Sequence, residues 1–472
     1  MVASSTLQEQ VTFLLKQDLF ASAERVGAFL LGASRNEDNH SAALELYADA
    51  LFGKQELQRA LQYYKQAMQR RKVGGAGRAS PDDGGPGYSS VTNIEEAELK
   101  FKECRCYVAL DEIPNAIRAL EGVPAALRSL KANLLLGQVY MSTGTGSRLH
   151  AMRCFKDAVA QCPTALEAVE ALVELGVGGS EIVSLLQRSN TAAADLGWVE
   201  EYVMGLCGVQ RNDAAVTISN FSALDSRFPN NQPALLQVGI SHLAAERLDD
   251  AHYYFTKARV VDPLSVDAMD HFALLVKLRS GQPAGTSPSS PQSKTAGELN
   301  RLAHDLLAVA PARPEPWLAA ALYQQARGDL GAALGHVEKA LALSKGRHML
   351  AHSIKGDVLM ALGRPEVAIV AYFKAKDARR DLRAYRGLVE AYLAVRKLRE
   401  ALLTAKEATA TLRNCAGALV LLGRVLAVPQ TGAAEKERAR QLFGKALAMD
   451  PACADATIAL VDLHLGARQH QK

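Results

Sequence analysis

The sequence predicts an all-α solenoid, a stack of antiparallel helix pairs, and three observations support this. Two alanines, an aromatic residue and a proline recur with the same offsets, as Ala151-Phe155-Ala158-Pro163, Ala251-Phe255-Ala258-Pro263 and Ala439-Phe443-Ala446-Pro451. Pro229 and Pro263 lie 34 residues apart. No segment alternates polar and apolar residues as a half-buried strand does. Repeats of this length indicate an array of small units that share one continuous core.

Each offset has a physical reason in a pair of antiparallel helices, A and B. Small residues such as Gly239, Ala251 and Ala258 allow the two helices to cross closely. The aromatic Phe255 fills the space toward the next repeat, and Pro263 ends helix B because proline cannot continue a helix. This 34-residue pattern is typical of tetratricopeptide repeats, which coil into a right-handed superhelix.

The pattern divides the chain into five segments. We expect N-terminal helices and a first repeat over residues 1–72, and a flexible insert over 73–93 that is rich in glycine, proline and serine. Central repeats follow over 94–280, then a second low-complexity insert over 281–295 and C-terminal repeats over 296–472.

The last predicted element, over residues 452–466, is a helix A without a helix B. Its apolar residues are Ile458, Leu460, Val461, Leu463 and Leu465. Solenoids normally close with a polar cap. We therefore expect either a partner or further repeats to cover this face.

Composition limits the class of protein. A net charge of +4 is too small to indicate nucleic-acid binding. Seven cysteines, an odd number that falls mostly within helix patterns, favour reduced thiols and a location in the nucleus and cytoplasm. The sequence shows neither a signal peptide nor an apolar run of about 20 residues, the length of a membrane span.

The sequence contains no catalytic pattern, so we expect neither an enzyme nor a cofactor or metal. It has no phosphate-binding loop, and Cys104-x-Cys106 is too closely spaced for the usual zinc pair. The histidines at 304, 348, 352 and 464 are scattered, and surface or packing roles explain them better than ligation. The helix A that contains Leu235 and His242 lacks the Lys and Asn of a carboxylate clamp, which argues against a co-chaperone.

Two groups of residues are candidate interaction sites. The first is a candidate dimer interface near the N-terminus, more apolar than a terminal cap needs: Leu14, Leu15, Leu19, Phe20, Phe29 and Leu30. Alternatively, these residues pack on the first repeat and form no interface. The second is a basic stretch where an acidic protein partner docks: Lys374, Lys376, Arg379, Arg380, Arg383 and Arg386. Alternatively, these cations lie in solvent and complement a helix dipole.

Further details are similar to those of one family. They are Leu46-Tyr47-Ala48-Asp49-Ala50-Leu51-Phe52, Phe101-Lys102 with Cys104 and Tyr107, Gln161-Cys162-Pro163, Leu196 with Trp198, Pro314-Glu315-Pro316-Trp317, and Gly387-Leu388-Val389-Glu390-Ala391-Tyr392. In this order and with these irregular spacings, the chain resembles the family of anaphase-promoting complex subunit 7.

The resemblance implies a non-catalytic scaffold subunit of a cell-cycle ubiquitin ligase. It also implies a homodimer made through N-terminal repeats, with other tetratricopeptide subunits of the complex as partners and without nucleic acid or membrane. The alternatives are another tetratricopeptide subunit of the same complex, or an unrelated adaptor for trafficking or chaperones.

Overall fold

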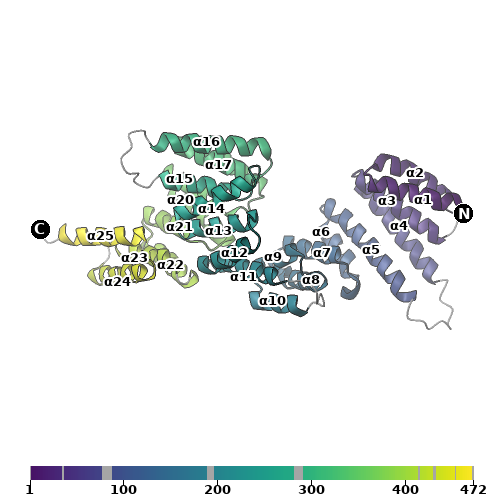
Figure 1. Cartoon of the computed structure of the whole chain (residues 1–472), viewed down its shortest axis with the longest axis horizontal. Coiled ribbons are helices and arrows are strands. Elements are labelled where there is room, and N and C mark those ends of the chain that lie inside the picture. Colours follow the sequence, from purple (N-terminus) through teal and green to yellow (C-terminus); the bar gives the residue numbers. More distant parts are fainter. Residues whose placement is uncertain are drawn as a thin grey trace. The chain divides into compact units, whose positions relative to one another are not determined.

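The computed structural model describes residues 2–34, 37–76, 88–188, 196–280, 291–412, 415–428, 432–451 and 453–469. Within these residues it consists of twenty-five α-helices, two short 3-10 helices and no strand, as the sequence predicts (Figure 1). The chain divides into two compact units, Met1–Val199 and Glu200–Lys472, each of which is described by itself.

Consecutive helices of the first unit pack against each other in antiparallel pairs. They are α1 (Val2–Lys16), α2 (Phe20–Ala33), α3 (Glu37–Gly53), α4 (Leu57–Ala76), α5 (Tyr88–Ala109), α6 (Ile113–Glu121), α7 (Leu130–Ser142), α8 (Arg148–Gln161), α9 (Leu166–Glu174) and α10 (Gly179–Arg188), with 3-10 turns at Ala125–Leu127 and Thr145–Ser147.

The second unit continues the same arrangement, from α11 onward. Its helices are α11 (Gly197–Arg211), α12 (Ala214–Arg227), α13 (Gln232–Ala244), α14 (Leu248–Val261), α15 (Met269–Ser280), α16 (Pro291–Val309), α17 (Pro314–Arg327), α18 (Leu330–Leu343), α19 (Met349–Ala361), α20 (Pro365–Ala378), α21 (Leu382–Ala394), α22 (Leu398–Thr411), α23 (Ala416–Leu426), α24 (Ala433–Met449) and α25 (Ala454–Gln469).

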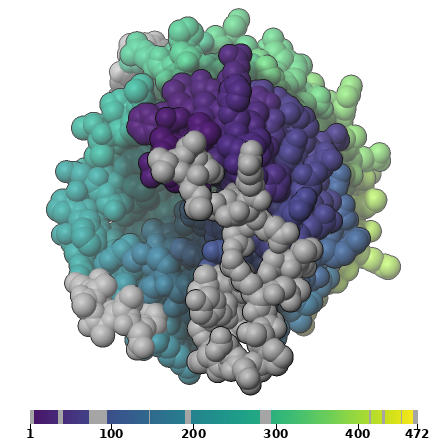
Figure 2. All heavy atoms as spheres, turned by 90° about the vertical axis from the view of Figure 1, so that its right-hand side faces the viewer, coloured from purple at the N-terminus to yellow at the C-terminus, as the bar shows by residue number. Residues whose placement is uncertain are grey.

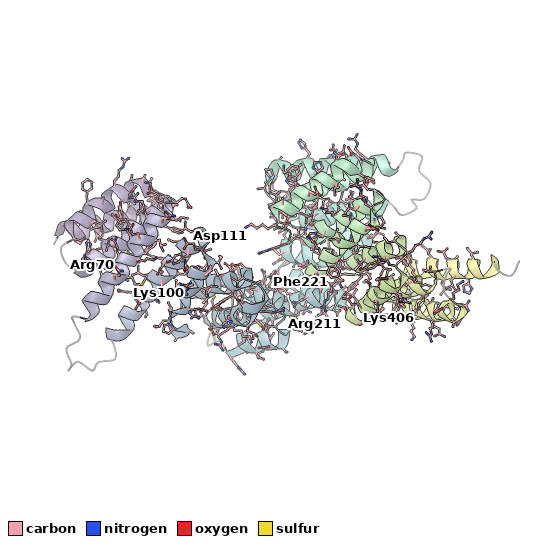
Figure 3. All side chains as sticks on the ribbon, turned by 180° about the vertical axis from the view of Figure 1, so that it is seen from behind. Arg70, Lys100, Asp111, Arg211, Phe221 and Lys406 are labelled. Atoms are coloured by element: carbon pink, nitrogen blue, oxygen red, sulfur yellow. The ribbon has the colours of Figure 1, made fainter. Side chains whose placement is uncertain are left out.

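The close helix crossings occur where the repeat pattern predicts them. A Cβ atom at Gly239 of α13 would lie 3.2 Å from the ring of Phe255 in α14, and one at Gly205 of α11 would lie 2.7 Å from the ring of Phe221 in α12 (labelled in Figure 3). Since Phe221 and Phe255 are almost fully buried, helix A needs glycine at these crossings.

Helix A usually ends with one residue in the left-handed region. Asn212 and Glu246 have φ angles of 53° and 61°, and Gly328 and Gly363 have φ angles of 83° and 69°. Glycine adopts this conformation without strain, and asparagine tolerates it better than most other residues do. Because this residue reverses the chain direction, helix B runs back along helix A.

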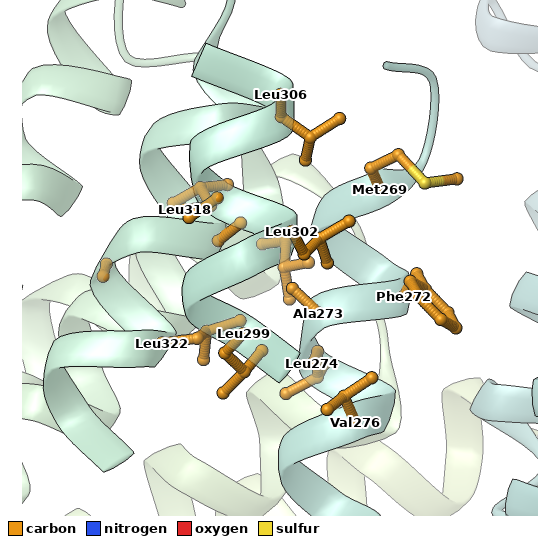
Figure 4. Close-up of a cluster of buried hydrophobic side chains, with 14 of the residues drawn as sticks. Met269, Phe272, Ala273, Leu274, Val276, Leu299, Leu302, Leu306, Leu318 and Leu322 are labelled. Atoms are coloured by element: carbon orange, nitrogen blue, oxygen red, sulfur yellow. The ribbon is translucent and has the colours of Figure 1, made fainter. Parts of the chain in front are cut away.

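The largest hydrophobic cluster lies in the second unit and joins helices α13 to α19. Figure 4 shows its centre, where Leu299 and Leu302 of α16 lie close to Ala273 of α15 and Leu322 of α17. Residues 281–290, between α15 and α16, lie outside the described residues. The cluster shows that helix B of this repeat packs normally after the interruption.

Helix ends differ from the predicted segment boundaries at both inserts. α4 extends to Ala76 and α5 begins at Tyr88, so helices occupy both ends of the segment predicted as a loop over 73–93. In the same way, α16 begins at Pro291, inside the segment predicted over 281–295. Neighbouring helices extend a helix end beyond the point that local propensity suggests. Residues 77–87 and 281–290 of the two predicted inserts are not described.

Candidate interaction surfaces

The six residues predicted as a dimer interface do not form one surface. Phe29 of α2 is 72% exposed and Leu19 is 51% exposed, whereas Leu30 is 1% exposed. Leu30 belongs to a small core with Val11 and Ala43, on which Leu14 and Leu15 are packed. Helices α1 and α2, coloured dark purple, face the viewer in Figure 2.

Phe13 of α1, which the candidate set omits, is 61% exposed. It lines a shallow hollow of about 410 Å³ between α1 and α2, together with Leu14 and Val26. Phe13 and Phe29 are therefore the large apolar side chains that this pair of helices offers to a partner. Phe13 was not predicted as an interface residue, because a helical period alone does not identify the exposed member of the run Phe13-Leu14-Leu15.

A second hollow, of about 450 Å³, lies between α1–α2, α3 and α5 of the first unit. Leu15 and Phe20 line it, so these two predicted interface residues lie here. The Arg105 guanidinium lies 4.4 Å from the centre of the Phe52 ring, and Lys102 bonds Glu45 and Asp49 at 2.7 and 2.8 Å. The hollow combines apolar side chains with charged groups, most of which already bond within the chain.

Most cations of the predicted basic stretch also have partners within the chain. Lys376 bonds Glu407 at 3.0 Å, Arg383 pairs with Asp357, and Arg386 pairs with Glu246 and Asp455. Arg379 donates to the carbonyl oxygen of Val209 at 3.1 Å. Of the six cations, Lys374 and Arg380 are exposed and the other four are half-buried. Lys374 and Arg380 are therefore the most accessible to a partner.

A buried carboxylate that the sequence did not single out lies in α15. Asp270 is 1% exposed and is flanked by two histidines, with Nδ1 of His271 at 3.0 Å and Nε2 of His348 at 3.4 Å. Burial raises the pKa of Asp270, but the two histidines outweigh this and lower that pKa to about 2. Nδ1 of His348 also accepts the backbone N–H of Ala351, so the histidine caps α19. The group therefore joins α15 to the start of α19.

The described residues contain no group of three or more His, Cys, Asp or Glu side chains placed to hold a metal. Burial raises the pKa of the Cys104 and Cys106 thiols to about 12, so these two cysteines are not nucleophilic at neutral pH. Among the helices described, none is long and apolar enough to cross a membrane.

Comparison with known proteins agrees with the fold. Residues 318–381 match the family model described as tetratricopeptide repeat. Anaphase-promoting complex subunit 7 of Arabidopsis thaliana is 32% identical over 479 residues, which cover 97% of this chain and 82% of that protein. This chain belongs to the anaphase-promoting complex subunit 7 family.

Two more members of the subunit 7 family extend the comparison. The protein of Dictyostelium discoideum is 27% identical, with 98% of this chain and 80% of that protein covered. The protein of Homo sapiens is 27% identical, with 89% of this chain and 72% of that protein covered. The similarity to the subunit 7 family thus extends through both compact units.

Proposed function

We propose that the chain is a non-catalytic scaffold subunit of the anaphase-promoting complex, in which its repeats provide contact surfaces for other tetratricopeptide subunits. The observation that carries the proposal is the 32% identity to the Arabidopsis subunit 7 over 97% of this chain. A match to a single repeat would support only a general adaptor, whereas this match extends over almost the whole chain.

A scaffold role also agrees with the chemistry of the described residues. Their polar side chains are used to join helices, as in the bond of 2.6 Å from the Tyr64 hydroxyl to Asp49 and the bond of 2.7 Å from the Tyr372 hydroxyl to Asp357. Both bonds join helix B to helix A of the same repeat.

A ubiquitin-transfer assay tests the scaffold role. The tagged chain is isolated from its own cells, and the isolate and the recombinant chain are each incubated with ubiquitin, E1, E2, ATP and a ligase substrate. We expect the isolate to transfer ubiquitin and the recombinant chain alone to transfer none. An isolate without ligase activity, or transfer by the recombinant chain alone, would contradict the proposal.

We also propose that two copies associate through α1 and α2. Phe13 and Phe29 support this, because they are 61% and 72% exposed on two helices that pack together, and a group of exposed apolar side chains can form an interface. Leu30 does not belong to the proposed contact, since it is buried within the unit. Of the residues first predicted, Leu19 and Phe29 remain accessible for it.

Light scattering with size-exclusion chromatography tests the association. At micromolar concentration we expect the full chain to have about twice its mass of 50.6 kDa, and deletion of residues 1–35 or the change Phe29→Asp to yield monomers. Leu149→Asp is the matched control, since Leu149 of α8 is 77% exposed and lies outside α1 and α2. A monomeric full chain would overturn the proposed dimer.

The basic stretch stays a candidate docking site for an acidic partner, with Lys374 and Arg380 as its accessible cations. Lys374→Glu combined with Arg380→Glu is expected to weaken binding of neighbouring subunits most at low salt, because exposed charges act mainly on association rate. If the variant and the unaltered chain recover equal amounts of those subunits at 50 mM salt, the proposed docking site is wrong.

We further propose a location in the nucleus and cytoplasm, in keeping with seven cysteines that form no disulfide in the structure. Fluorescence imaging of the tagged chain in its own cells tests this. Signal confined to the secretory pathway would contradict it.

A further inference from the structure

Two edges of the second unit that are far apart in the sequence touch each other. The turn between α11 and α12 meets the turn between α20 and α21: Nδ2 of Asn212 donates to the carbonyl oxygen of Arg380 at 2.6 Å, and the Arg379 guanidinium donates to the carbonyl oxygen of Val209 at 3.1 Å. The Asn212 and Arg380 positions are separated by 168 residues. Stacking places each repeat against its neighbours only, so stacking does not explain these contacts.

The next repeat contributes an equivalent contact. Glu246, in the turn between α13 and α14, accepts from the guanidinium of Arg386 in α21 at 2.5 Å. Asn212 and Glu246 are 34 residues apart and both end helix A in the left-handed conformation. Two successive repeats therefore use the same turn position to reach α21 and the turn before it.

Arg386 also has a second carboxylate partner. Asp455 of α25 lies 3.2 Å from its guanidinium, and the same carboxylate lies 3.3 Å from Arg424 of α23. The Arg386 guanidinium thus has two carboxylate partners, Glu246 and Asp455, from different repeats.

The contact between the two edges is polar. Tyr372 of α20 and Tyr385 of α21 belong to two hydrophobic clusters, and neither of these clusters contains a residue of α11 or α12. Exposed ion pairs stabilise by about 0–1 kcal/mol each and are screened by salt. Such a contact opens far more easily than the stacked repeats unfold.

We infer that Asn212, Glu246, Arg379 and Arg386 form a polar latch that closes one turn of the superhelix in the second unit, and that high salt or loss of the latch opens it. The latch uses Arg379 and Arg386, two of the cations first assigned to partner docking. It holds the α11–α14 edge against the α20–α21 edge.

The test measures the distance between the two edges in the full chain. Spin labels are placed at Ala215→Cys in α12 and Asp377→Cys in α20, both exposed, with the half-buried Cys162 and Cys415 changed to serine. Electron–electron double resonance then reports the distance distribution. At 50 mM salt we expect one narrow distribution, which broadens toward longer distances at 1 M salt.

The variant Asn212→Gly with Glu246→Gly removes the two latch side chains of the α11–α14 edge, and glycine keeps the left-handed turns free of strain. We expect it to broaden the distribution at 50 mM salt as 1 M salt does. Arg396→Gly is the matched control, because Arg396 has a φ angle of 62° in the turn between α21 and α22 and lies outside the latch. A narrow distribution in the double variant, or equal broadening by the control, would overturn the latch.

Arg386→Gln serves as a second variant that leaves both turns intact. It is expected to broaden the distribution with the helical circular dichroism unchanged. An unchanged distribution in Arg386→Gln would also overturn the proposed role of the guanidinium.

Discussion

At the scale of single residues, the side-chain volumes of the two residues that face each other at a helix crossing compensate one another. Where helix A has Gly239, helix B has Phe255, and a Cβ on the glycine would lie 3.2 Å from the ring. In α21 the corresponding position carries Val389, and the facing residue of α22 is Ala405, in the same cluster. A larger residue on one helix is thus matched by a smaller one on the other, which keeps the crossing close.

Gly356→Ala tests this compensation. A Cβ at Gly356 would lie 2.5 Å from the ring of Tyr372, which is 2% exposed and cannot move aside. We expect the free energy of unfolding to fall by about 1–3 kcal/mol because of overpacking. Gly335→Ala in α18 is the control: its Cβ would meet nothing within 4 Å, so helix propensity should raise stability by about 0.5–1 kcal/mol. Urea unfolding gives both values, and equal effects of the two changes would contradict the account.

His348→Ala tests the buried carboxylate. The change removes the cap of α19 and leaves Asp270 facing an empty site, so we expect a loss of about 2–5 kcal/mol of unfolding free energy. Asp270→Asn should lower the free energy of unfolding by less in the His348→Ala variant than in the unaltered chain. Additive costs in this double-mutant cycle would show that the two side chains do not interact.

At the scale of helices, burial makes the second unit sensitive to pH. Burial is the largest cause that lowers the pKa of His242, His252, His336 and His352 below the ordinary value of 6.5. These residues lie on α13, α14, α18 and α19. Below about pH 6.5 the unfolded chain therefore binds more protons at these positions than the folded chain does.

The unfolding free energy should consequently be nearly full at pH 7.5 and lower at pH 5.5, because the loss begins as the pH falls through about 6.5. His352→Gln should reduce this slope, because His352 is 7% exposed and burial is the largest cause that lowers its pKa. Denaturant titrations at pH 7.5 and 5.5 measure the change in unfolding free energy. An unfolding free energy that rises on acidification would contradict the prediction.

The helix pairs could be predicted because the repeat pattern is local. Residues such as Ala60, Tyr64 and Ala67 fall on one face of one helix, and all three are buried as the pattern requires. The interface residues could be predicted only in part. Phe29 and Leu30 are adjacent and equally apolar, and only the packing of α2 on the rest of the unit determines which of them is buried.

The partners of the basic stretch could not be predicted for a different reason. Glu246 lies 140 residues from Arg386, and nothing in the local sequence links the two positions. The contact depends on the pitch of the superhelix, which is the sum of many small rotations between repeats. Asp270 was missed in the same way, because His348 is brought to it from four helices further along the chain.

At the scale of the whole molecule, a solenoid transmits a defect only to neighbouring repeats. Ala258→Trp, at the crossing of α13 and α14, is expected to lower stability by about 1–3 kcal/mol. Hydrogen exchange should speed up in α13 to α15 and stay unchanged in α1 to α4, which belong to the other compact unit. Uniform acceleration along the chain would contradict repeat-wise stability.

The account treats the chain as a stack of repeats whose surfaces hold other subunits in place. The measurement that tests this most directly is tandem affinity purification of the tagged chain from its own cells, with quantitative mass spectrometry of the proteins that remain bound. We expect the other subunits of the anaphase-promoting complex in stoichiometric amounts. An assembly that contains trafficking or chaperone proteins, and no subunit of that ligase, would contradict the proposed function and leave the fold unaffected.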